Sequence, residues 1–164
     1  MSPATLLEVE GLNVSFPGRG GVTHAVRNVT FSLGRERLGI VGESGSGKST
    51  TGRALLGLIP HPGIVSAKRM SLGGRNLMGL GDADWQELRG RRISMVMQDP
   101  KYSLNPVIKV GHQIQETYRL HHRATAEEAR KHALAMLDAV KIRDADLVYH
   151  LYPHQHQAHL FGSC

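Results

Sequence analysis

The feature that most constrains the fold of this chain is a glycine-rich segment in its first third. The segment matches the pattern G-x-x-x-x-G-K-[ST] and reads Gly42, Glu43, Ser44, Gly45, Ser46, Gly47, Lys48, Ser49, Thr50. Glycines allow the backbone to turn several N–H groups toward one point, which makes a nest for an anion. In this pattern the lysine reaches terminal phosphates and the next hydroxyl can hold Mg²⁺. We therefore expect a nucleotide triphosphate site here, with Ser49 as a metal ligand.

The segments on either side of the glycine-rich loop are of the types that such a site requires. Residues 38–41 form a continuous apolar run, which predicts a strand covered on both faces. After the loop, Ala54, Leu55 and Leu58 lie on one helical stripe, and Pro60 is expected to end that helix. The N-terminus of the helix would then point its free N–H groups at the phosphates. A glycine-rich turn without a ligand is the alternative, and this context disfavours it.

The pattern of apolar residues predicts an α/β chain. Residues 7–16 and 26–33 alternate between apolar and polar, as two paired half-buried strands would, with a loop at Pro17–Gly21 between them. Residues 93–97 are a second, largely apolar segment and predict another strand. Helices are predicted from about residue 107 onward, because apolar residues there recur every three or four positions.

One of these predicted helices carries a specific start signal. Thr125 is followed three positions later by Glu128, the spacing of a capping box, in which each side chain satisfies a backbone N–H of the other residue. We therefore expect a helix to begin directly after Thr125.

Composition disfavours several classes of protein. The formal net charge is +6, but the basic residues are scattered and only 5% of residues are aromatic, so we expect no nucleic-acid partner. No apolar stretch is long enough to cross a bilayer. The single cysteine is Cys164, which rules out a disulfide within the chain and fits a reducing, cytoplasmic compartment.

Taken together, the motifs resemble the ATP-binding subunits of ABC transporters. Residues 38–50 resemble the Walker A region of that family, and Met95–Pro100 resembles its Q-loop. Ser103–Pro106 and Tyr152–Gln155 resemble flanking motifs of the oligopeptide/dipeptide/nickel importer group. The resemblance covers residues 5–155. It implies a P-loop NTPase core with an N-terminal antiparallel β-subdomain and the start of a helical subdomain.

The resemblance also implies a division of the chain. Residues 1–98 would form the β-subdomain and the P-loop core up to the Q-loop, and residues 99–155 part of the helical subdomain. Residues 156–164 are unlike the family. The family's L-S-G-G-Q-type signature, its Walker B strand and its switch histidine do not occur in this sequence. We therefore expect an incomplete, C-terminally truncated member.

Two further residues take roles from the resemblance. Phe16 matches the aromatic residue that stacks on adenine, and a core residue at a strand end is the alternative. Gln98 matches the glutamine that contacts Mg²⁺ and the attacking water, and that links the site to the membrane subunit. An ordinary polar strand terminus is the alternative for Gln98.

The function that the resemblance implies is the energising of an importer for peptides or nickel. The cofactors would be ATP and Mg²⁺, and the partners would be membrane-spanning permease subunits and a second ATP-binding subunit, identical or different. Such a subunit lies in the cytoplasm against the inner face of the membrane. Because the signature and Walker B are missing, we expect ATP binding without hydrolysis. The alternatives are a non-catalytic nucleotide-binding module, a non-functional gene remnant, or an unrelated P-loop kinase or GTPase.

Overall fold

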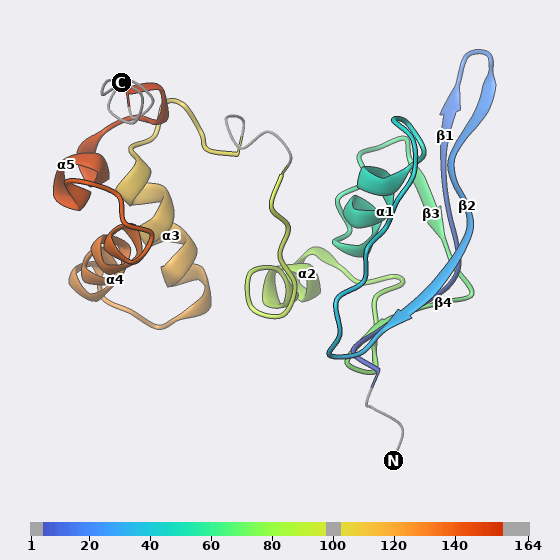
Figure 1. Ribbon diagram of the computed structural model, residues 1–164, viewed down its shortest axis with the longest axis horizontal. Helices are drawn as coiled ribbons and strands as arrows, with labels where there is room; N and C mark the ends of the chain where they lie inside the picture. The colour runs from blue at the N-terminus through green and yellow to red at the C-terminus, as the bar shows by residue number, and fades with distance from the viewer. Residues whose placement is uncertain (1–4, 98–102, 156–164) are drawn as a thin grey trace. The chain divides into compact units, whose positions relative to one another are not determined.

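The computed structural model describes residues 5–97 and 103–155. It contains two compact units, which divide between Ile93 and Ser94 (Figure 1). The boundary predicted from the Q-loop, between residues 98 and 99, lies outside the described residues and stays a prediction. Each unit is described by itself below.

The first unit is built around a long β-hairpin. Strand β1 (Leu7–Gly18) pairs antiparallel with β2 (Gly21–Leu33), as the alternating pattern predicted. The connection is shorter than the predicted loop, because Pro17 pairs with Val22 and Gly18 pairs with Gly21. Only Arg19 and Gly20 remain in the turn, and both are exposed.

Short strands complete an antiparallel sheet in the order β2-β1-β4-β5. Strand β4 (Arg69–Leu72) pairs with β1 on the side away from β2, and β5 (Arg75–Asn76) pairs with β4. Strand β3 (Ile64–Ser66) pairs with the later part of β1. The predicted N-terminal antiparallel β-subdomain is therefore present.

The alternating apolar residues of β1 form the centre of the core of the first unit. Leu12 and Val14 are fully buried, and Val9 is 1% exposed. Gly11 has a φ of +62° in the left-handed region, and the register of the hairpin shifts on either side of Leu12. The other buried apolar side chains of the unit are Leu7, Val26, Ala54, Leu55, Leu56, Met70, Leu72, Leu77, Trp85 and Leu88.

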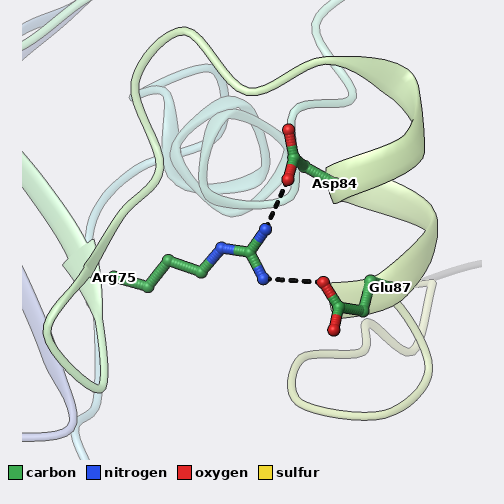
Figure 2. Close-up of polar contacts among 3 residues, drawn as sticks. All are labelled: Arg75, Asp84 and Glu87. Carbon is green, nitrogen blue, oxygen red and sulfur yellow. Dashed lines mark hydrogen bonds and ion pairs between the residues drawn. The ribbon is translucent and has the colours of Figure 1, made fainter.

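Helix α2 (Asp82–Leu88) is tied to β5 by one arginine. The Arg75 guanidinium reaches Asp84 Oδ1 at 2.5 Å and Glu87 Oε2 at 2.9 Å (Figure 2). The two carboxylates are three residues apart and thus share one face of the helix. The hydrogen bond to Glu87, followed by the charges of both acids, raises the pKa of Arg75. Arg75 therefore holds the helix against the edge of the sheet through two charged partners.

The strand predicted at residues 38–41 was wrong for this structure. These residues have no regular secondary structure, and Val41 is 95% exposed. The apolar run indicates burial on both faces, but a strand also needs neighbouring strands to satisfy its backbone groups. No strand of the described residues pairs with this segment.

The strand predicted at residues 93–97 was wrong for the same reason. Ile93 forms a single bridge with Arg89, residues 94–97 have no regular structure, and Val96 is 94% exposed. Apolar side chains of both segments are therefore exposed to solvent, although residues of these types are usually buried.

Within its described residues, the second unit contains the helices α3 (Val110–His121), α4 (Ala126–Ala139) and α5 (Ala145–His150). The helical block predicted from residue 107 onward is confirmed. The apolar core of the unit is formed by Val110, Ala133, Leu137, Val148 and Tyr149. None of the helices in residues 5–97 and 103–155 is long and apolar enough to cross a membrane.

Two local features fix the helices of the second unit. Thr125 caps α4 in the predicted capping box: its hydroxyl accepts from Glu128 N–H at 3.2 Å, and Glu128 Oε2 accepts from Thr125 N–H at 2.8 Å. Tyr149 is 3% exposed and donates its hydroxyl to Gln115 Oε1 at 2.7 Å. Its ring lies directly on Gly111, where a Cβ would overlap it.

Candidate functional site

The glycine-rich loop leads directly into helix α1 (Lys48–Leu55). Gly47 is the N-cap of the helix, with a φ of +89°, and Gly45 is also in the left-handed region at +81°. The loop is closed by a hydrogen bond from Ser46 N–H to Glu43 O at 3.2 Å. Because a glycine N-cap has no side chain to accept the first N–H groups of α1, the positive end of the helix is left open for an anion.

The ammonium group of Lys48 donates to three oxygen atoms of this loop. Its Nζ donates to Gly42 O at 2.6 Å, to Glu43 O at 2.7 Å and to Ser46 Oγ at 3.2 Å. These three acceptors bring the charge beside the N–H groups of the loop. The arrangement concentrates positive potential at one point on the surface, as binding of a polyphosphate requires.

Gly47 also fixes where the loop sits on the sheet. A Cβ at this position would overlap the carbonyl oxygen of Ala25 and come within 3.3 Å of Val26 Cγ2. Both residues belong to β2. Only glycine therefore allows the loop to approach the strand this closely at this φ.

The residues predicted for the phosphate loop come together in this loop and in the first turn of α1: Gly42, Glu43, Ser44, Gly45, Ser46, Gly47, Lys48, Ser49 and Thr50. Ser49 is exposed in that first turn, where its hydroxyl is open to a metal ion. Gln98 lies outside the described residues, so its predicted partnership with Ser49 at Mg²⁺ stays a prediction.

Phe16 lies near the end of β1 and is half-buried. It pairs with Thr23 on β2, two residues before Ala25, the residue that Gly47 contacts. One edge of its ring packs on Gly63, where a Cβ would come within 2.7 Å of Phe16 Cε1. Phe16 thus lies in the β1–β2 pair, and β2 carries Ala25, the residue that Gly47 of the loop contacts. Packing on Gly63 holds the Phe16 ring in place.

The residue types of the sequence do not reveal the backbone contact between Gly47 and Ala25. No sequence signal could have found it, because every residue type carries the same carbonyl oxygen.

A family model described as ABC transporter matches residues 26–155 of the chain. A putative peptide import ATP-binding protein of Brucella abortus is 44% identical over 156 residues, which cover 94% of this chain and 47% of that protein. A dipeptide transport ATP-binding protein of Lactococcus lactis is 41% identical over 157 residues, with 94% and 45% covered. The chain thus spans about half the length of these curated relatives.

A glutathione import ATP-binding protein of Salmonella choleraesuis is 47% identical over 157 residues, which cover 92% of this chain and 25% of that protein. Among solved structures, an ATP-binding cassette in a dimeric post-hydrolysis state, bound to ADP and Pi, superposes with a TM-score of 0.63. It is 21% identical, and the match covers 93% of this chain and 66% of the cassette. This likeness shows that the two chains share a fold.

Proposed function

This chain belongs to the ABC transporter family, and on that basis we propose that its glycine-rich loop binds Mg-ATP as part of the ATP-binding subunit of a peptide importer. The observation that carries the proposal is the position of Lys48. Its ammonium donates to the carbonyl oxygens of Gly42 and Glu43, in the loop that leads into the N-terminus of α1. A chain of phosphates is thus the ligand favoured by the glycine-rich backbone, by the charge of Lys48 and by the N-terminus of α1.

The residues of the chain fit the cofactor in named roles. N–H groups of residues 42–47 and the Lys48 ammonium would hold the phosphates, and the hydroxyl of Ser49 would hold Mg²⁺. Phe16 would stack on the adenine, a contact worth about 1–3 kcal/mol for an aromatic ring against a base. Gln98 would complete the metal site. Bound ATP supplies the phosphoanhydride bond whose hydrolysis energises transport in this family.

The proposed partners follow from the relatives. The named relatives import peptides, dipeptides and glutathione, which favours a peptide over nickel as the imported solute. Permease subunits of the membrane and a second ATP-binding subunit are the proposed partners, at the inner face of the cell membrane. The dimeric state of the related cassette supports the second partner.

A thermal unfolding titration with Mg-ATP tests the binding proposal. At a ligand concentration of about one hundred times Kd, the folded chain gains roughly 2.7 kcal/mol of stability. We expect the gain to disappear in Lys48→Ala, because the charge that meets the phosphates is removed. Lys68→Ala is the matched control: this exposed lysine forms a surface ion pair with Glu10, at 3.9 Å, and its loss leaves the gain intact. An unchanged melting temperature of the folded wild-type chain with Mg-ATP would refute the proposal.

Turnover is expected to be negligible in these 164 residues. Their sequence contains the loop and Gln98 but no segment that matches the signature or Walker B. Absence of the general base alone costs about 10²–10⁴ in rate. A phosphate-release assay on the purified chain measures this, with Lys48→Ala as the background. Sustained release that Lys48→Ala abolishes would contradict the expectation.

A further inference from the structure

The C-terminal end of helix α1 is held by an arginine of the segment that follows α2. Arg89 donates from Nε to Leu56 O at 2.8 Å and from Nη2 to Gly57 O at 2.8 Å. These carbonyl groups directly follow the last helical residue, Leu55, and belong to the negative end of the helix. A planar guanidinium can meet two such acceptors at once, which a lysine ammonium cannot do in the same geometry.

Trp85 completes the contact. Its indole ring lies directly on Gly57, where a Cβ would overlap the ring, and Gly57 has a φ of +63°. The Arg89 guanidinium lies 5.0 Å from the centre of the same ring, within the range of a cation–π interaction. Trp85 is 8% exposed. We call Trp85 and Arg89 the α1 clamp.

The clamp acts on the helix that carries the proposed phosphate site. An α1 of 8 residues is roughly 12 Å long, so its two ends are close enough to move as one rigid body. At its N-terminal end, Gly47 packs on Ala25 of β2. At its C-terminal end, the clamp sets the tilt of the helix. The direction in which the first N–H groups of α1 point depends on both attachments.

The clamp is itself anchored to the sheet. Trp85 belongs to α2, whose Asp84 and Glu87 are bound by Arg75 of β5, as Figure 2 shows. Arg89 directly follows α2, and its own N–H donates to Trp85 O at 2.9 Å. A continuous series of contacts therefore runs from the edge of the sheet, through α2 and the clamp, to α1.

We propose that Arg89 is a positioning residue for nucleotide binding, which acts through α1 and not by touching the ligand. The inference rests on the proposed function of the loop. It predicts that a folded protein with a weakened clamp binds Mg-ATP less tightly. It also predicts that Trp85, the only tryptophan of the sequence, changes its fluorescence when nucleotide orders the other end of α1.

The test is a Mg-ATP titration followed by Trp85 fluorescence and, independently, by equilibrium dialysis. Arg89→Lys keeps the positive charge but not the planar guanidinium that donates to two carbonyl groups at once. Arg89→Ala removes both the charge and the donors. Arg91→Ala is the matched control, because Arg91 is exposed and lies two residues away. Each titration is made well below the melting temperature of its variant, so that only folded protein is compared.

We expect Kd from dialysis to rise about tenfold in Arg89→Lys, the effect of one charge-assisted hydrogen bond, and at least as much in Arg89→Ala. Arg91→Ala should bind as the wild type does. A purely structural role would lower the melting temperature of both Arg89 variants and leave Kd of the folded protein unchanged, which would overturn the inference alone. Failure of the wild-type chain to bind in dialysis would overturn the proposed function and the inference with it.

Discussion

Gly47 has a backbone conformation that favours glycine, and it lies in the loop that we propose binds phosphate. Its φ of +89° costs a residue with a side chain about 1–2 kcal/mol, and a Cβ would also overlap the Ala25 carbonyl oxygen. We therefore expect Gly47→Ala to lower the urea midpoint of the first unit and to abolish binding of Mg-ATP. Gly39→Ala is the control, because a Cβ there meets nothing within 4 Å. Equal urea midpoints for the two variants would contradict this account.

At this scale the sequence pattern predicted which residues form the glycine-rich loop but not what they contact. The spacing of Gly42, Gly47 and Lys48 predicted a phosphate loop, and in the structure Lys48 Nζ donates to Gly42 O and Glu43 O within that loop. The acceptors of Lys48 Nζ are mostly backbone carbonyls, which no residue type distinguishes. The same holds for Arg89, whose two acceptors are carbonyl oxygens more than thirty positions earlier in the chain.

Among the elements, α4 has the best-defined beginning. Thr125 accepts the Glu128 N–H, and replacement of such an N-cap by alanine costs about 1 kcal/mol. Thr125→Ala should therefore lower the melting temperature of the helical signal in circular dichroism. Thr117→Ala is the matched control, since its hydroxyl bonds within α3 to Gln113 O and alanine favours a helix interior. An equal loss of melting temperature in both variants would show that the Thr125 cap does not stabilise the helix.

The same capping box predicts a dependence on pH. Hydrogen bonds from the backbone and then the hydroxyl of Thr125 lower the pKa of Glu128 below its ordinary value of 4.5. Because the folded-state pKa is the lower one, the ionised carboxylate stabilises the helix above the unfolded-state pKa. That stabilisation is lost as pH falls through the folded-state pKa. Glu128→Gln should therefore show a weaker acid dependence of its urea midpoint than the wild type, and an identical dependence would contradict the assignment.

Elements with local signals were predictable, and elements that need distant partners were not. The hairpin of β1 and β2 and the helices α3 and α4 follow from alternation, helical spacing and a capping box, all encoded within a few residues. Residues 38–41 and 93–97 show only that burial is favoured. Whether such a segment becomes a strand depends on the presence of a neighbouring strand, which its own sequence does not contain.

At the scale of the whole molecule, these two apolar segments contribute a group of exposed apolar side chains, namely Leu38, Ile40, Val41, Val96 and Met97. Val41 is 95% exposed, so replacing it with lysine removes no packing. We expect Val41→Lys to keep the melting temperature while it reduces binding of a hydrophobic dye and self-association in light scattering. Val9→Thr is the contrasting variant: at 1% exposed it should lower the melting temperature by burying a hydroxyl. Unchanged dye binding in Val41→Lys would show that the run is covered in solution.

The two-residue turn at Arg19 and Gly20 offers a practical advantage. Exposed turn residues between two strands are the positions where a chain best accepts an insertion. An epitope or a fluorophore attached there would leave the loop, the clamp and the helical unit with their native sequence. The protein can thus be immobilised by its hairpin tip without any change to the sequence of residues 42–50.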